Sequence, residues 1–342
     1  MRVDAARVFA LAWRWGPRIP EPVLQALLGT VAEAVCWLRL PGVRQLEANL
    51  SRVRPDLPPR ALRRLSRTAM RRYMRYYGEV FRLPALTPLQ LRARVRDTGL
   101  GPVREHVAAG RSVSLALSHS GNWDLAGAWG TQYLGHVLTV AEVLEPAEVF
   151  EEFLGFREGL GMSIVPLAKG TNVFRELVRQ ARHGTHVIPL LADRDLSAHG
   201  VEVDLVGHRA RVAPGPAALA VALGQPVAFV MVRHERLRGA RRQAAGSRWG
   251  IVVEVGEPIE PPADRTGRAA VEHLTQAWVD QMAAALVEHP ADWHMLQKVF
   301  LDDLDRDRLA RAAERATAEH PAERTAAEHP AERTAADRGG TA

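Results

Sequence analysis

The stretch that decides the fold is residues 112–125, S-V-S-L-A-L-S-H-S-G-N-W-D-L. Its first residues are small or apolar and predict a buried strand, Gly121 and Asn122 favour a turn, and an apolar-periodic segment begins at Trp123. The stretch therefore predicts a strand, a tight turn and the start of a helix, with His119 at the carboxyl end of the strand. In an open α/β sheet, ligands bind at that edge.

His119 is followed five positions later by Asp124, and this pair predicts proton abstraction from a hydroxyl group. The ordinary pKa of imidazole lies near physiological pH, and a carboxylate bonded to its far nitrogen fixes the tautomer and stabilises the imidazolium. His119 would then be the general base and Asp124 its orienting partner. A plain helix cap is the alternative, because Asn122 or Asp124 can accept hydrogen bonds from free backbone N–H groups.

A second charged strand end follows residues 186–191, H-V-I-P-L-L, because Asp193, Arg194 and Asp195 come soon after this apolar run. We expect Asp193 to give His119 a second carboxylate contact, and Arg194 to meet an anion or to pair with Asp195. The alternative is a surface turn with an internal salt bridge that contributes little stability.

Composition and charge narrow the class of protein. The chain has 342 residues, 47% of them hydrophobic, and its single cysteine, Cys36, excludes an internal disulfide and favours a reducing compartment. The net charge of +6 is concentrated in residues 1–104, where basic residues outnumber acidic ones by roughly three to one. Such a surface attracts anionic lipid or nucleic acid. Since no helix-turn-helix, RRM, KH or zinc-finger signature is present, we expect no nucleic-acid partner.

Residues 1–104 have the pattern of helices interrupted by prolines, and we expect no secretory signal there. Residues 23–38 form the most apolar stretch, yet it is too short and too polar for a membrane span. Trp13, Trp15 and Trp37, with arginines beside them, are typical of a helix at a bilayer surface. An amphipathic helix packed on the core fits the same pattern.

From residue 112 onward, strand and helix patterns alternate, which predicts a mainly parallel central sheet flanked by helices, an α/β fold. The expected strands are 112–118, 137–143, 163–168, 186–192, 201–206, 226–234 and 250–255. We expect one domain over residues 1–308, with a basic, helical, membrane-facing part at 1–104 and a catalytic core at 105–308. Residues 309–342, in which A-E-H-P-A-E-R-T-A occurs twice, are expected to form a disordered tail.

Three further segments carry charged or aromatic groups. Arg157 lies on a predicted helix, where it could bind phosphate or pair with a neighbouring glutamate. The basic segment 236–248 is compatible with phosphate or membrane contact, or with a disordered hairpin loop. Residues 289–297, H-P-A-D-W-H-M-L-Q, lack the H-E-x-x-H arrangement, so we expect no metal site. We expect a structural clamp there instead, with Trp293 packed and His294 hydrogen-bonded.

These motifs together resemble a known family. His119 and Asp124 form the H-x-x-x-x-D motif of glycerolipid-type acyltransferases, and H-S-G-N-W-D-L, A-D-R-D-L, G-V-E-V-D-L-V-G and A-P-G-P-A-A-L-A occur in the order seen in the lipid A lauroyl/myristoyl acyltransferases. F-R-E-G-L-G and H-P-A-D-W-H-M-L-Q resemble more narrowly the actinobacterial branch, which acylates phosphatidylinositol mannosides. The resemblance runs from about residue 20 to residue 305.

The resemblance implies transfer of a palmitoyl chain from acyl-CoA to the 6-hydroxyl of the mannose on inositol O-2 of phosphatidylinositol mannosides. No cofactor is implied, because acyl-CoA is a substrate. The protein would be peripheral on the cytoplasmic face of the cell membrane, with its basic N-terminal helices on anionic phospholipid.

The resemblance also assigns roles to single residues. His119 is the base and Asp124 its partner, while the mycobacterial members carry a glutamate at the position of Asp193. The side chain here is one methylene shorter, so two arrangements stay open, a direct contact between Asp193 and His119 and a water between them. The candidates for binding acyl-CoA are Arg157, Arg194 and His199, and an apolar groove between helices is expected to hold the acyl chain.

Two rival functions stay open. Another glycolipid or a lysophospholipid could be the acceptor, or the protein could be a hydrolase that uses His119 with Ser118 or Ser120. The chain has no G-x-S-x-G elbow, which disfavours the hydrolase. A pure membrane-binding module is weakest, since it leaves the two charged strand ends unexplained.

We predict that deleting the residues after about position 310 leaves enzymatic activity intact, because the repeat has no apolar face to bury. Turnover by the purified truncated protein, beside the full chain, measures this. A soluble, folded but inactive truncation would contradict the prediction.

Overall fold

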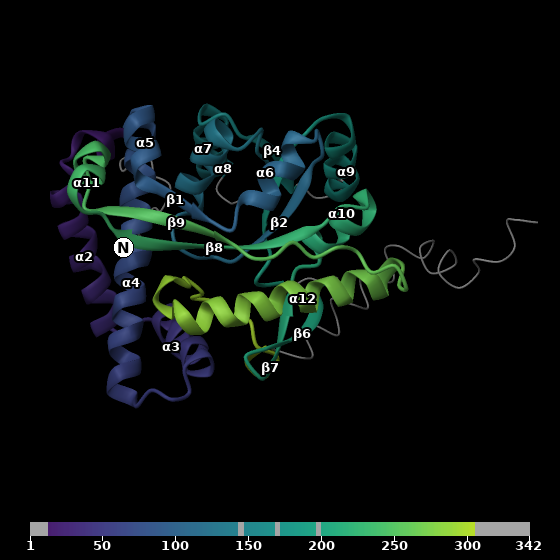
Figure 1. The fold of residues 1–342 in the computed structure, drawn as a ribbon. Helices are drawn as coiled ribbons and strands as arrows, with labels where there is room; N and C mark the ends of the chain where they lie inside the picture. The colour runs from purple at the N-terminus through teal and green to yellow at the C-terminus, as the bar shows by residue number, and fades with distance from the viewer. Residues whose placement is uncertain (1–12, 143–146, 168–171, 196–199, 305–342) are drawn as a thin grey trace, which may run out of the picture.

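A five-stranded sheet in the order β1-β9-β8-β2-β5 forms the centre of the computed structural model, which describes residues 13–142, 147–167, 172–195 and 200–304 (Figure 1). β8 and β9 pair antiparallel, whereas β1 with β9, β2 with β8 and β2 with β5 are parallel. The predicted mainly parallel sheet is therefore confirmed. The strands are β1 (Val95–Thr98), β2 (Val113–Leu117), β5 (Val187–Leu191), β8 (Val227–Arg236) and β9 (Trp249–Val255).

Two smaller sheets adjoin the central one. β3 (Leu138–Glu142) and β4 (Ser163–Leu167) form a parallel pair, and a bridge between Val137 and Val187 connects β3 to β5. β6 (Val201–Leu205) and β7 (His208–Val212) form an antiparallel hairpin. The strand segments expected from residue 112 onward are thus confirmed.

The helices cover both faces of the central sheet, and Figure 1 shows α7, α8 and α9 on the face opposite α12. The helices are α2 (Glu21–Trp37), α3 (Pro41–Val53), α4 (Pro59–Arg82), α5 (Pro88–Arg94), α6 (Gly101–Ala108), α7 (Trp123–Tyr133), α8 (Ala147–Gly159), α9 (Val173–His183), α10 (Gly215–Leu223), α11 (Gly239–Ala245) and α12 (Gly267–Glu288). Proline stands in the first turn of α2, α3, α4 and α5. Proline is tolerated there because those N–H groups lack helical partners.

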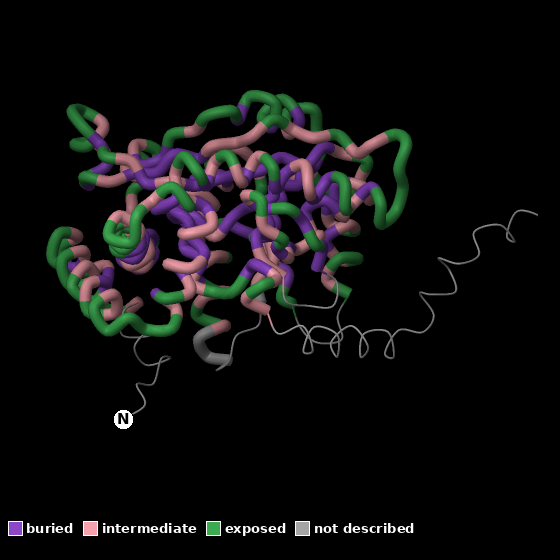
Figure 2. Tube along the Cα trace, turned by 90° about the horizontal axis from the view of Figure 1, so that it is seen from below, coloured by how far each residue is buried: buried purple, intermediate pink, exposed green. Residues whose placement is uncertain are grey.

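Each face of the sheet has its own hydrophobic core, and β8 contributes to both. Because successive strand residues point to opposite faces, Phe229 and Met231 pack on one core and Val230 and Val232 on the other. On the first side, Phe229 stacks on Trp278 of α12 with ring centroids 6.5 Å apart. Figure 2 shows the buried residues gathered along the middle of the molecule.

The N-terminal helices pack on one another and on the core through α4. Ala69 and Tyr76 of α4 are buried, and the arginines nearest its beginning are exposed. Arg72 differs from these arginines, because its guanidinium turns inward and pairs with Asp292. α4 therefore joins the basic surface to the interior.

One prediction about local structure is wrong, and one alternative left open by the sequence is excluded. Residues 1–104 are not entirely helical, since Val95–Thr98 forms the edge strand β1, paired in parallel with β9. The segment 236–248 is not a disordered loop: it contains α11 and joins the antiparallel strands β8 and β9. The expected disordered tail at 309–342 lies outside the described residues.

Candidate active site

His119 and Asp193 meet because their strands are parallel neighbours. Leu117 and Leu191 are in register at the ends of β2 and β5, so the residues that follow both strands emerge at one edge. His119 Nδ1 lies 2.5 Å from Asp193 Oδ1, and the His119 backbone N–H donates to Asp193 Oδ2 at 2.9 Å. Of the two arrangements left open, the direct contact is the one observed, because the adjacent backbones let the shorter side chain reach His119.

Asp193 is held as a carboxylate in a buried position. Its side chain is 0% exposed, and Trp293 Nε1 donates to Oδ2 at 2.8 Å. Burial alone would raise the pKa of Asp193, but the charge of His119 and the hydrogen bonds from His119 and Trp293 outweigh it and lower this pKa. An ionised Asp193 accepts the Nδ1 proton of neutral His119, which leaves Nε2 to receive a proton. The packed position predicted for Trp293 is confirmed.

Asp124 has different partners from those predicted. Asn122, not Asp124, caps α7 by accepting a hydrogen bond from the N–H of Leu125 at 2.9 Å. Asp124 Oδ1 accepts from Arg157 Nε at 2.8 Å, and Asp124 Oδ2 accepts from the Tyr76 hydroxyl at 2.7 Å. Asp124 thus ties α7 to α8 and α4, and the carboxylate bonded to His119 is Asp193.

A cavity of about 710 Å³ opens beside His119. His119, Asp124, Arg157 and Arg194 all line it, and the His119 side chain is 32% exposed. The negative charge of Asp124 raises the pKa of Arg157, so this guanidinium stays charged. The structure therefore brings these predicted residues to one place, while His199 lies outside the described residues.

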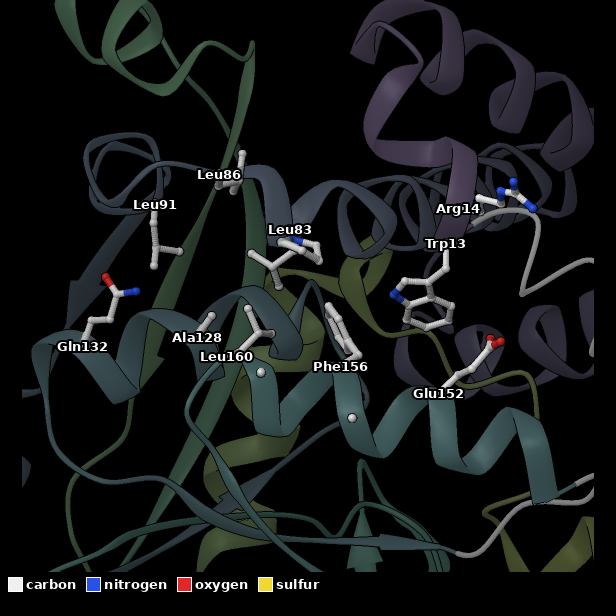
Figure 3. A pocket seen from close by; sticks show the side chains of 13 residues that line it. Trp13, Arg14, Leu83, Leu86, Leu91, Ala128, Gln132, Glu152, Phe156 and Leu160 are labelled. Atoms are coloured by element: carbon white, nitrogen blue, oxygen red, sulfur yellow. The ribbon is translucent and has the colours of Figure 1, made fainter.

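A second cavity of about 840 Å³ is mainly apolar, with Arg14, Gln132 and Glu152 as its polar lining residues, and matches the apolar groove expected between helices (Figure 3). The helices α7 and α8 contribute to both cavities, since Ala128 and Phe156 line this one while Gly127 and Arg157 line the first. Its remaining apolar walls come from segments far apart in the sequence: Trp13, Leu83, Pro84, Leu86, Leu91 and Leu160. No local pattern marks such a cavity.

A buried polar network behind the site was missed by the sequence analysis. His234 Nδ1 lies 3.0 Å from Asp292 Oδ1, and Asp292 also pairs with Arg72. On the other side of the ring, His234 Nε2 lies 3.7 Å from Glu79 Oε2, which accepts from Asn122 Nδ2 at 2.9 Å. The network links α4, β8 and the loop after α12 to the residue that caps α7. Burial alone lowers the pKa of His234, but Asp292 and Glu79 outweigh it and raise this pKa.

His294 lies beside this network, and its ring lacks the hydrogen bond that was predicted. Its backbone N–H donates to the carbonyl of His119 at 2.7 Å, but neither ring nitrogen has a hydrogen-bond partner among the described residues. The ring packs against Tyr73, with centroids 5.3 Å apart, in a fully buried setting. Burial lowers the pKa of His294 to about 3, so the ring is neutral.

Ser118 and Ser120 are turned into the protein. Both are buried, their Oγ atoms lie 2.9 Å apart, and Ser120 Oγ accepts from the N–H of Val232 at 3.1 Å. Among the described residues, neither lines the cavity beside His119. This placement argues against a nucleophilic serine in a hydrolase.

The chain is similar to several known acyltransferases. The model of the family described as bacterial lipid A biosynthesis acyltransferase matches residues 6–302. A phosphatidylinositol mannoside acyltransferase from Mycolicibacterium smegmatis is 36% identical over 303 residues, covering 89% of this chain and 93% of the relative. One from Mycobacterium tuberculosis is 37% identical over 311 residues, covering 90% and 92%. A solved structure, the 1-acyl-sn-glycerophosphate acyltransferase of Thermotoga maritima, is 13% identical with a TM-score of 0.34, covering 79% and 97%.

The sequence matches and the family model define the class of protein as an O-acyltransferase enzyme. They extend over most of the chain and most of each curated relative. The chain belongs to the family of bacterial lipid A biosynthesis acyltransferases. The resemblance that the sequence motifs indicated is thereby confirmed.

The pKa shifts of the buried histidines His234 and His294 predict that the free energy of unfolding is highest near pH 6.5. The raised pKa of His234 contributes stability below its ordinary value of 6.5 that is lost as the pH rises through the folded-state pKa. The lowered pKa of His294 has the opposite effect, a loss of stability as the pH falls below 6.5. Below this pH the unfolded chain binds a proton at His294, whereas the buried ring in the folded chain stays neutral.

Urea unfolding at several pH values measures both slopes, each at most about 1.4 kcal/mol per pH unit for one proton. In the His294→Phe variant, the free energy of unfolding should fall less steeply as the pH drops below 6.5. An unchanged acidic slope in that variant would refute the assignment of the slope to His294.

Proposed function

We propose that the protein transfers a fatty acyl chain, palmitoyl, from acyl-CoA to the 6-hydroxyl of the mannose on inositol O-2 of phosphatidylinositol mannosides. The observation that carries the proposal is the His119 and Asp193 pair at the edge of a cavity. The printed names of the relatives, at 36% and 37% identity, support the glycolipid acceptor.

In this mechanism His119 acts as a general base toward the sugar hydroxyl. Nε2 takes the hydroxyl proton as the oxygen attacks the thioester carbonyl carbon, and Asp193 stabilises the imidazolium that forms. The tetrahedral intermediate collapses with cleavage of the C–S bond. The proton on His119 then passes to the departing thiolate of coenzyme A, so the base is regenerated without a covalent enzyme intermediate.

The other cavity residues have supporting roles in the proposal. Arg194, or a backbone N–H at the start of α7, meets the negative charge that develops on the thioester oxygen. Arg157, fixed by Asp124, faces the phosphates of coenzyme A. The acyl chain enters the second cavity, whose volume and mainly apolar lining suit a hydrocarbon chain (Figure 3).

A membrane surface is the proposed place of reaction, because the acceptor is a lipid. The proposed contact is made by the N-terminal helices, where exposed apolar side chains of α2 lie near exposed arginines of α4. Within the described residues no single helix is long and apolar enough to cross a membrane, although α2 and α3, bent by 81°, meet that test as a pair. The proposed location is peripheral, on the cytoplasmic face of the cell membrane.

We predict that His119→Ala abolishes acyl transfer without unfolding the protein, because it removes the base and little core volume. Mass spectrometry of phosphatidylinositol mannoside incubated with palmitoyl-CoA measures the product, beside the wild type and a control without acceptor. Free palmitate without acylated glycolipid from the wild type would indicate a hydrolase or a different acceptor. Near-normal turnover by the variant would refute the assignment of His119 as the general base.

We predict that Asp193→Asn lowers kcat by roughly 10²–10⁴-fold, because an amide that donates to Nδ1 places the imidazole proton on Nε2. Asp124→Asn is the matched comparison. It leaves the contact to His119 in place and loosens Arg157, so it should raise the KM for acyl-CoA more than it lowers kcat. An inactive Asp124→Asn beside a near-normal Asp193→Asn would return the orienting role to Asp124.

A further inference from the structure

The corner at which α2, α3 and α4 meet contains a cavity that the proposed reaction does not use. Its volume is about 400 Å³, and its lining joins the end of α2 to the first turns of α4. The charged side chains in the lining are Glu47 and the arginines Arg39, Arg60, Arg63, Arg64 and Arg67. We call this cavity the arginine pocket.

The arginine pocket has more positive charge than its carboxylates neutralise. Glu47 lies 3.5 Å from Arg39 and 4.0 Å from Arg63, so one carboxylate serves two arginines. Arg60 and Arg64 have no carboxylate within salt-bridge distance among the described residues. An excess of guanidinium groups around one cavity favours an anion with several oxygens, such as a phosphate.

The backbone at Arg39 is a second observation. The backbone N–H groups of Arg39 and Leu40 donate to the carbonyls of Cys36 and Val35 at the end of α2, the pattern in which glycine is usual at the position of Arg39. Arg39 has a φ of +47°, a left-handed conformation that disfavours a side chain. The chain thus places a guanidinium at a position where glycine would be less strained, and the guanidinium lines the pocket.

The wall of the pocket also contains an unsatisfied hydroxyl. Ser66 is 2% exposed, and its Oγ has no hydrogen-bond partner among the described residues. A buried hydroxyl without a partner is unfavourable, and a phosphate oxygen in the pocket that Ser66 lines would supply an acceptor.

An apolar rim next to the pocket indicates where the anion comes from. Trp37 is 79% exposed, Leu38 58% and Leu40 43%, and they follow one another around the corner between α2 and α3. The stripe continues up α2 at Leu27 and Val31, which are four residues apart and lie on one helix face. Binding of a freely diffusing phosphate or of a nucleic acid would not require exposed apolar side chains beside the pocket. A bilayer has hydrocarbon next to its phosphates and would contact both the rim and the pocket.

We propose that the arginine pocket binds the phosphate of an anionic phospholipid headgroup while Trp37, Leu38 and Leu40 enter the bilayer interface. The inference rests on the proposed function, which places the protein at a membrane, and adds a defined lipid site. α4 connects this site to the reaction, since Arg67 lines the pocket and Tyr76, which bonds Asp124, lies about 14 Å further along the helix. The bound lipid would fix the height and tilt of the catalytic cavity over its lipid acceptor.

Flotation of the full-length protein with vesicles of phosphatidylcholine, with or without phosphatidylglycerol, tests the site. Arg39→Gly should weaken binding to the anionic vesicles by about tenfold or more, because it removes a charge-assisted hydrogen bond. Its melting temperature should be unchanged or higher, because glycine relieves the left-handed backbone. Reduced binding by this variant therefore does not come from unfolding.

Arg44→Ala is the matched control, since Arg44 is an exposed arginine of α3 outside the pocket. It should weaken binding by at most about fivefold, the effect of one charge near an anionic surface. Equal losses for Arg39→Gly and Arg44→Ala would overturn the site in favour of diffuse attraction. Inorganic phosphate that binds the wild type as tightly as the vesicles do would overturn the assignment to a lipid.

The flotation assay contains no acyl-CoA and no mannoside. An inactive wild type that still requires Arg39 for vesicle binding would therefore refute the proposed function alone. An active enzyme whose vesicle binding is unaffected by Arg39→Gly would refute the lipid site alone.

Discussion

The architecture of the site depends on one ionised carboxylate that is kept out of water. Asp193 receives three hydrogen bonds, from the backbone and ring of His119 and from the indole of Trp293. A buried carboxylate is costly unless its oxygens are satisfied, so these donors must be in place for the fold to form. These groups come from the ends of two parallel strands and from the segment after α12. The position of the imidazole therefore depends on the pairing of strands in the central sheet.

A second layer of buried charge stands behind this carboxylate. Glu79, Asp292 and His234 come from three elements, with the two carboxylates on opposite sides of the His234 ring, and Asn122 connects Glu79 to the first turn of α7. Removing any one of them leaves charged groups without partners in a region of low dielectric constant. Rigidity at the edge of the sheet is thus maintained by electrostatics as much as by apolar packing.

The sequence could predict the strands other than β1 and β7, the mainly parallel arrangement of the sheet and the edge of the site, because these follow from local patterns. Alternation of apolar strands with helices determines a parallel sheet, and charged residues directly after two strands identify its active edge. The choice between Asp124 and Asp193 depended on register between strands, which no spacing along the chain encodes. The strand V-R-D-T at Val95–Thr98 was missed since its polar residues gain a strand partner only from β9. The polar network and the apolar cavity unite segments far apart in sequence.

The position of Trp13 has a consequence for how the molecule is assembled. Its indole packs edge-on against Phe81, Phe153 and Phe156, so the earliest described residues close a cavity whose other wall is α8. During synthesis the ribosome releases Trp13 long before Phe156 exists. Trp13 can meet Phe81 once α4 has been made, but its contacts with Phe153 and Phe156 form only after nearly half of the protein has been made. The apolar cavity is consequently a product of late, long-range closure rather than of any locally folding unit.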